Sequence, residues 1–186
     1  STNLAVRTIA LQGLAAVANS RAYPVLAAAL DASTAQERGA AALFCAEWAA
    51  RLDAQTALRM GRDVIRAGEK FGDDQVTSIG LAILAAAAPK TVPDELIAAL
   101  GHAHRMVRGQ AIRLLVSCRD ERVSVALRKL VVSSQEDARF DGVEALAMRD
   151  ELDAKQARTL LQDKAVTVRL AAARHLLRLE GESALD

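Results

Sequence analysis

The sequence predicts an all-α protein, an α-solenoid of about five helix pairs followed by a terminal helix. The first observation is composition. Of the 186 residues, 52% are apolar, 3% are aromatic and only three are proline, a balance that favours helix over strand. The second is a pattern that returns along the whole chain. It consists of Val-Arg, a small residue three positions after the arginine and an apolar residue seven positions after it. We call the arginine position the anchor.

The anchor occurs six times. The intervals between copies are 31, 39, 31, 31 and 30 residues, within the range of solenoid repeats. Two copies are degraded, because Glu37 replaces the valine in one and Thr77 replaces the arginine in the other. The small residue is present in all six. We therefore expect a single repeat domain over residues 1–186, with anchors at Arg7, Arg38, Thr77, Arg108, Arg139 and Arg169.

The clearest copy, Val107-Arg108-Gly109-Gln110-Ala111-Ile112-Arg113-Leu114-Leu115, at a period near 31 resembles HEAT-like repeats, in particular the short form named after phycobilisome lyases. The resemblance covers nearly the whole chain. It implies that each repeat is a pair of antiparallel helices, that the anchor opens the first helix, and that the second helices line a concave surface. Such repeats serve many unrelated proteins as scaffolds, so the resemblance indicates a fold and not one activity.

The first repeat begins where Asn3 can cap a helix. Its second helix opens at Pro24, whose missing N–H has no cost in a first turn, and carries Leu26 and Leu30. In the second repeat, the first helix is expected from about Gln36 through Leu52.

The second helix of that repeat starts near Asp53 and is unusually long. The 39-residue interval adds about two helical turns, and the apolar spacing continues towards Lys70. We expect the helix to end at Phe71-Gly72-Asp73-Asp74, where the glycine can stop it and either Asp73 or Asp74 caps the next helix.

In the third repeat, we expect Thr91 to cap a second helix that begins at Pro93. The fourth repeat is expected over residues 106–132, with Asp120 as the cap between its helices, and the fifth over residues 136–162. A final helix from Val166 to about Leu179 has no predicted second helix before a polar tail, so it is either a cap or a truncation.

Composition leaves the partner class open. The net charge of +1 selects neither nucleic acid, membrane nor acidic substrates. Cys45 and Cys118 both fall in expected anchor helices and make no disulfide framework, so we expect a reduced, cytoplasmic protein. The longest Ala-rich run is too short to span a bilayer. Nineteen arginines against five lysines suggest a bacterial source, and a start at Ser1 suggests a piece of a longer polypeptide.

No pattern predicts an enzyme, a cofactor or a metal. His102 and His104 form a His-x-His, but a zinc site needs three or four ligands and no Cys, Asp or Glu cluster lies beside them. His175 is expected to be partly buried or at an interface. HEAT-like hydroxylases use His-Glu dyads, which are missing here. HEAT-like DNA glycosylases use aromatic side chains in a basic groove, whereas this chain has one Trp and one Tyr.

Two surfaces are candidates for binding a partner. Residues at corresponding places in the last two second helices would form a basic strip on the concave face, able to bind carboxylates in bidentate fashion: Arg122, Arg128, Lys129, Lys155, Arg158 and Gln162, with Val132 and Thr159 as neighbours. The other surface is the extended second helix of the second repeat, with Arg62, Arg66 and Phe71. The competing interpretation is that these are ordinary solvated side chains.

We therefore expect a non-catalytic scaffold that binds a partner protein or an acidic peptide segment on its concave face. The alternatives are, first, a HEAT module that contacts DNA phosphates and, second, a bilin-lyase-like protein. The anchor arginines are expected to be structural and to form a ladder between repeats. Trp48 is expected in the core, with an interface role as the alternative.

Overall fold

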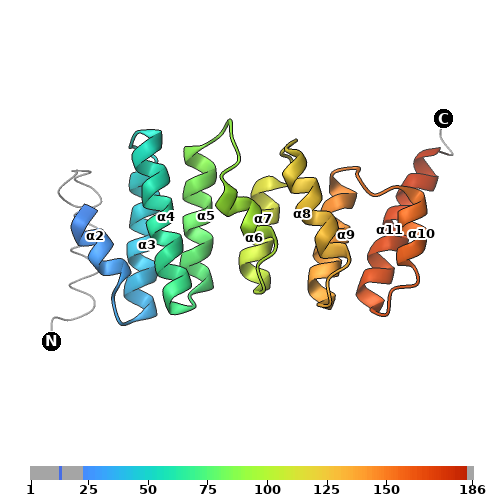
Figure 1. Ribbon diagram of the computed structural model, residues 1–186, viewed down its shortest axis with the longest axis horizontal. Coiled ribbons are helices and arrows are strands. Elements are labelled where there is room, and N and C mark those ends of the chain that lie inside the picture. Colours follow the sequence, from blue (N-terminus) through green and yellow to red (C-terminus); the bar gives the residue numbers. More distant parts are fainter. Residues whose placement is uncertain (1–12, 14–22, 184–186) are drawn as a thin grey trace. The chain divides into compact units, whose positions relative to one another are not determined.

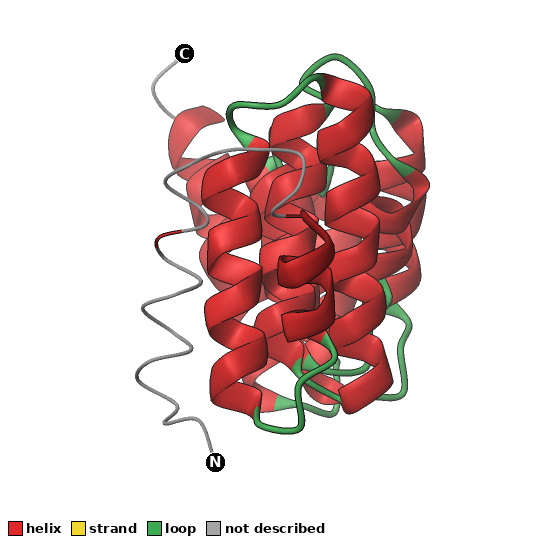
Figure 2. Cartoon of the chain, turned by 90° about the vertical axis from the view of Figure 1, so that its left-hand side faces the viewer, coloured by secondary structure: helices red, strands yellow, loops and turns green. Residues whose placement is uncertain are grey.

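The structure is a computed structural model that describes residue 13 and residues 23–183. Within these residues it contains helices and no strand (Figures 1 and 2), which confirms the all-α prediction. The helices of this part of the chain are α2 (Tyr23–Leu30), α3 (Ala35–Ala49), α4 (Ala54–Phe71), α5 (Asp74–Ala87), α6 (Asp94–Leu100), α7 (Arg105–Leu115), α8 (Glu121–Val131), α9 (Glu136–Met148), α10 (Ala154–Leu160) and α11 (Val166–Ser183).

The chain divides into two compact units, Ser1–Leu96 and Ile97–Asp186. In the first unit, α3 packs against α2, α4 and α5, and the most extensive pairing is that of α4 with α5. In the second unit, α9 packs against α7, α8 and α11, and α11 also packs against α10. The helix expected before Pro24, its Asn3 cap and Arg7 lie outside the described residues.

Every anchor in the described part of the chain is the fourth residue of a helix. Thr77 is the fourth residue of α5, and the four anchor arginines hold the same place in α3, α7, α9 and α11. The sequence pattern therefore located the beginning of these five helices correctly.

Aspartates set several helix starts. Asp53, Asp73 and Asp120 are N-cap residues of α4, α5 and α8, and each carboxylate accepts a hydrogen bond from a backbone N–H of the first turn. Asp73, and not Asp74, is thus the cap of α5. α4 extends to Phe71 and ends at Gly72, whose φ of 63° lies in the left-handed region. The predicted extension and its stop signal are confirmed.

Four expectations about boundaries are wrong. α3 ends at Ala49 and not at Leu52. α6 begins at Asp94, so Thr91 lies too far before it to be the N-cap residue. Cys118 follows the end of α7 and lies in a loop. α11 continues to Ser183, through residues expected in a polar tail, because that segment keeps good helix formers such as glutamate.

The small residue three positions after the anchor has a steric cause. A Cβ added to Gly142 of α9 would lie 2.8 Å from Cβ of Leu130 and 3.0 Å from the backbone nitrogen of Val131, both in α8. A Cβ added to Gly80 of α5 would lie 2.8 Å from the backbone nitrogen of Ile65 in α4. At both places the preceding helix crosses so closely that backbones nearly touch, and larger side chains cannot be accommodated without movement.

The anchor arginines tie loops to the following helices. Arg108 has no exposed surface; its Nη1 donates to the carbonyls of residues 102 and 103, while Nη2 and Nε bind Asp137 at 2.7 Å and Asp141 at 2.9 Å. Arg139 donates to the carbonyls of residues 133 and 134 and binds Asp163 through Nε and Nη2, both at 2.9 Å.

The same arrangement occurs in the first unit. Arg38 donates to the carbonyl of residue 32, at 2.9 Å, and pairs with Asp73 at 3.6 Å. Together with Arg108 and Arg139, it bridges its own preceding loop and an acid at or near the start of the next anchor helix. Such buried arginines hold the packing and are not available to a ligand.

The core of the first unit surrounds Trp48, which is 2% exposed and packs with Leu26, Met60 and Val64. The core placement of this tryptophan is confirmed. Its indole N–H is buried and has no hydrogen-bond partner among the described residues. Cys45 is also fully buried there, and this burial, with a smaller effect of the Asp63 carboxylate, raises the pKa of its thiol to about 12.

Candidate partner-binding surface

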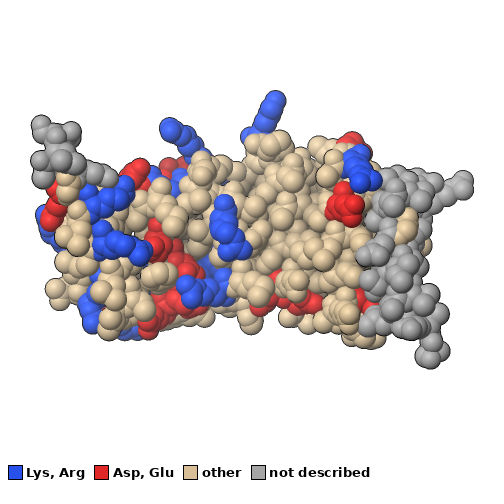
Figure 3. Space-filling model, turned by 180° about the vertical axis from the view of Figure 1, so that it is seen from behind, with Lys and Arg blue, Asp and Glu red and all other residues tan. Residues whose placement is uncertain are grey.

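Charged side chains are unevenly placed on the face seen in Figure 3. The C-terminal unit carries mixed clusters of basic and acidic residues, whereas the N-terminal unit shows a broad area with few charges. Within the N-terminal unit, α5 has no charged residue between Val76 and Ala87. On this face, the charged side chains of the C-terminal unit are of both signs and form no continuous basic area.

The residues expected on the strip lie on α8 and α10, with Gln162 just after α10, and three of the basic ones have acidic partners. Nε and Nη2 of Arg122 donate to Asp120 in the same turn, at 2.7–3.1 Å. Arg158 pairs with Glu180 of α11 at 3.1 Å. The remaining members, Lys129, Lys155 and Gln162, are exposed.

Arg128 is held more loosely than the others. Its guanidinium lies 3.7 Å from Glu121 and 3.6 Å from Glu151, and half of its side chain is exposed. Contacts of this length at the surface contribute on the order of 0–1 kcal/mol. Arg128 can therefore exchange these partners for an incoming carboxylate at little cost.

Beside Arg128 lies a groove between α8 and α10. Its volume is about 370 Å³, and its lining is mainly apolar: Arg128, Val131, Val132, Leu146, Leu152, Gln156, Thr159 and Leu160. Val132 is 82% exposed, the highest value among the large apolar residues of the described chain. Of the candidates expected on the strip, only Arg128 lines this groove, together with the two named neighbours Val132 and Thr159.

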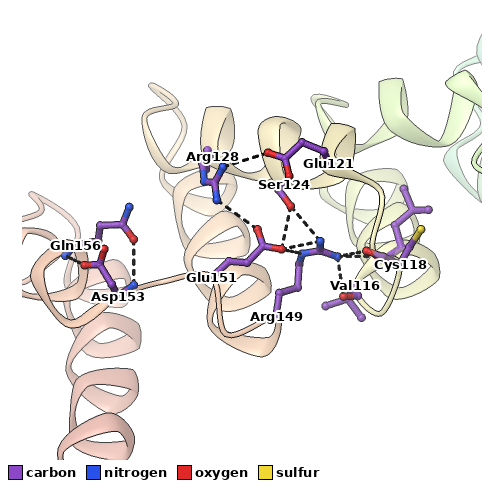
Figure 4. A network of polar contacts seen from close by, with 10 residues as sticks. Val116, Cys118, Glu121, Ser124, Arg128, Arg149, Glu151, Asp153 and Gln156 are labelled. Atoms are coloured by element: carbon purple, nitrogen blue, oxygen red, sulfur yellow. Dashed lines mark hydrogen bonds and ion pairs between the residues drawn. The ribbon is translucent and has the colours of Figure 1, made fainter.

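A polar network fixes the turn that leads from α9 into α10 (Figure 4). Nη1 of Arg149 donates to the carbonyls of Leu115, Val116 and Cys118, and its Nε donates to Glu151 at 2.8 Å. Ser124 of α8 donates to the same carboxylate at 2.9 Å. The turn itself passes through Asp150, whose φ of 56° is rare for a residue with a side chain.

Glu151 connects this network to Arg128. Burial alone would raise its pKa, but hydrogen bonds from Ser124 and Arg149 and the positive charges of Arg149 and Arg128 outweigh that effect, so the pKa of Glu151 is lowered. The carboxylate therefore remains ionised at neutral pH and holds the loop end of the groove in place. Sequence reasoning missed this network, because nothing in the repeat pattern marks Arg149, which follows the anchor by ten residues.

The candidates on the extended helix α4 make contacts within their own unit. Nε of Arg62 donates to Glu95 of α6 at 2.6 Å, which lowers the pKa of that carboxyl. Arg66 pairs with Asp63 at 3.0 Å. Phe71 is 37% exposed, and the guanidinium of Arg38 lies 4.4 Å from its ring centroid. Arg62 and Phe71 thus contact other elements of the unit, whereas the Arg66 side chain is 75% exposed and pairs only within α4.

Each of the three histidines has a hydrogen-bond partner or ring contact within the protein. Nδ1 of His102 accepts a hydrogen bond from the backbone N–H of His104 at 3.1 Å. His175 is 4% exposed, and its Nε2 lies 2.6 Å from the carbonyl of Leu152, so Nε2 must carry the proton. No group of three or more His, Cys, Asp or Glu residues suited to a metal ion occurs within residues 23–183 or at residue 13.

No helix among the described residues has the length and apolar character needed to cross a membrane. Compared with known proteins, the chain matches no family model and no curated protein.

Proposed function

We propose that this chain is an α-solenoid of HEAT-like helix pairs and that it acts as a non-catalytic scaffold for a partner protein. The proposal rests on the groove between α8 and α10. Three features support the solenoid arrangement. They are the regular interval between anchors, the fixed place of the anchor in each helix, and the buried anchor arginines, such as Arg108, that join the preceding loop to an acid of the next anchor helix.

The groove suits a short peptide segment with an apolar side chain followed or preceded by a carboxylate. Val132, Leu152 and Leu160 offer an apolar surface, while Gln156 and Thr159 can bond to a peptide backbone. Arg128 at the edge is half exposed and weakly paired, so it supplies the positive charge for the carboxylate.

Binding to nucleic acid is the rival function, and the ion pairs argue against it. Phosphate binding draws on several free cations acting together. On this surface Arg122 and Arg158 already bind Asp120 and Glu180. An apolar residue as exposed as Val132 gives a phosphate backbone nothing to contact but is a good site for an apolar peptide side chain.

The test is affinity capture from a cell lysate with nuclease treatment, comparing wild type with Val132→Glu and with the double variant Arg128→Glu/Arg158→Glu. Val125→Glu is the matched control, because Val125 lies on the same helix, is 44% exposed and does not line the groove. We expect one captured protein to be lost with Val132→Glu and with the double variant, and to be kept with Val125→Glu.

The bound protein should then be dissected into peptides, and the peptide that binds should contain an acidic residue next to an apolar one. Equal capture by all variants would refute the groove as the site. Capture that disappears after nuclease treatment would refute a protein partner and favour nucleic acid.

A further inference from the structure

The outer face of α11 carries an apolar stripe. Val166, Leu170 and Leu177 are 56%, 65% and 71% exposed. Their spacing of four and seven residues places them on one side of the helix, with Ala173 between them. Isolated exposed leucines are ordinary, but three large apolar residues aligned on one helix face form a patch of the kind that marks an interaction site.

Equivalent positions in α7 and α9 show what the corresponding face of an anchor helix contacts within the second unit. Arg105, Glu136 and Val166 each stand three residues before an anchor. Arg105 of α7 pairs with Asp141 of α9 at 3.5 Å, and Glu136 of α9 accepts a hydrogen bond from Thr167 of α11 at 2.7 Å. In both cases the residue faces the next anchor helix.

The position of Leu177, at the other end of the stripe, leads to the same conclusion. Ala147 and Leu177 each stand eight residues after an anchor. The carbonyl of Ala147 accepts a hydrogen bond from Arg178 of α11 at 3.2 Å. Leu177 thus occupies the place by which α9 contacts α11, yet it is exposed. α11 presents the packing face of an anchor helix without a helix against it among the described residues.

Arg169 gives independent evidence from charge. Its Nη1 donates to the carbonyls of Asp163 and Lys164, at 2.8 and 3.1 Å, which repeats the loop contacts of Arg139. In Arg139, Nε and Nη2 bind the carboxylate of Asp163, which precedes α11. Within residues 23–183, Nε and Nη2 of Arg169 bind no carboxylate. Among the described residues, no acid is bound to this half of the guanidinium, which in Arg139 donates to a carboxylate.

We propose that the outer face of α11 binds an amphipathic helix of a partner protein, with an aspartate just before that helix paired to Arg169. The apolar side of the partner helix covers Leu177, whose counterpart Ala147 contacts α11, and Leu170 on the same stripe. Leu170 and Leu177 supply the apolar contact for that helix, and Arg169 supplies the positive charge for the aspartate. The surface is separate from the groove between α8 and α10, so the two proposals stand or fall independently.

The probe is a synthetic helical peptide built on the α9–α11 contact. It begins with the Asp-Lys-Ala sequence of residues 163–165 and continues as an Ala/Glu/Lys helix. Leucine replaces the four residues of α11 that face α9, namely Thr167, Ala171, Arg174 and Arg178, and a staple on the opposite side keeps it helical. The control peptide carries Asn in place of the aspartate.

Binding is measured by fluorescence anisotropy to the whole chain. We expect the Asn peptide to bind at least tenfold more weakly, and Leu170→Glu/Leu177→Glu to weaken binding of the Asp peptide to the same degree. Leu43→Glu, at an exposed leucine of α3, should have no effect.

Absence of binding by the Asp peptide, or equal binding by both peptides, would overturn the proposal. Sedimentation provides the remaining test. If the chain alone forms a dimer that Leu170→Glu/Leu177→Glu dissociates, the occupant is a second copy and the proposed partner helix is wrong.

Discussion

Replacing Asp163 with asparagine should destabilise the protein, although the side chain keeps its size. The carboxylate accepts hydrogen bonds from Nε and Nη2 of Arg139, both at 2.9 Å, and from the backbone N–H of Ala165 at 2.8 Å. Asparagine keeps one acceptor, presents an NH₂ group to the guanidinium and leaves the charge of Arg139 unpaired. The side chains of Arg139 and Asp163 are only 5% and 12% exposed.

Breaking a buried ion pair by removing one partner costs about 3–5 kcal/mol. Asp163 keeps some exposure and the asparagine keeps one hydrogen bond, so we expect a loss of about 2–3 kcal/mol in the free energy of unfolding. Asp150→Asn is the control. It removes an ion pair to Arg178 whose carboxylate is 76% exposed, and asparagine tolerates the positive φ of this position. Its cost should stay below about 1 kcal/mol.

The assay is urea unfolding followed by far-UV circular dichroism, at several pH values. The hydrogen bond from Arg139 is the main reason that the pKa of Asp163 is lowered. A carboxylate with a lowered folded pKa stabilises the fold above its unfolded pKa, about 3.9, and loses that contribution as pH falls through the folded value. The difference between wild type and Asp163→Asn should therefore be complete at pH 7 and narrow below about pH 4.

Equal stability of Asp163→Asn and Asp150→Asn at pH 7 would refute the structural role assigned to the anchor arginine. A difference that stays constant from pH 7 to pH 3 would show that the asparagine acts through packing and not through charge.

Three further outcomes can be checked with single substitutions. Gly142→Val should lower the free energy of unfolding by about 1–3 kcal/mol in urea titrations, because the added side chain would collide with α8. Gly109→Ala is the control, at a helical position with room for a methyl group, and should be neutral or stabilising. A larger loss of stability for Gly109→Ala than for Gly142→Val would contradict the close crossing of α8 and α9. Gly72→Ala should cost about 1 kcal/mol in the same titration, since φ is 63° there, and no loss would mean that the turn relaxes. With a thiol reagent at pH 8, the folded protein should react at Cys118 and not at Cys45, because burial raises the pKa of the Cys45 thiol to about 12. Both cysteines should react in urea. Rapid labelling of Cys45 in the folded protein would contradict this prediction.

Local signals in the sequence predicted much of the fold. Gly72 and Asp120 act through their own backbone neighbourhood, so their roles could be read without tertiary information. Helix ends set by distant residues could not be read in this way. α7 was expected to include Cys118, but Arg149 takes up the carbonyls of Leu115, Val116 and Cys118, and the chain leaves the helix there.

The candidate site was only partly predictable for a similar reason. Helical register identified Arg128 and Val132 as neighbours on an exposed surface, and both line the groove. Register does not show which acids approach from other elements. Glu151 and Glu180 reach Arg128 and Arg158 from the α9–α10 turn and from α11, so the strip has acids beside two of its arginines that the helical register did not reveal.

The burial of Trp48 has a practical consequence for all of these experiments. The chain has one tryptophan and one tyrosine, Trp48 and Tyr23, and both belong to the unit Ser1–Leu96. Intrinsic fluorescence therefore reports the unfolding of that unit alone, whereas far-UV circular dichroism sums the helices of both. Unfolding curves that superimpose for the two signals would show one cooperative transition. Curves that separate would give each unit its own stability without any label, and substitutions such as Asp163→Asn would then move the dichroism curve and leave the fluorescence curve in place.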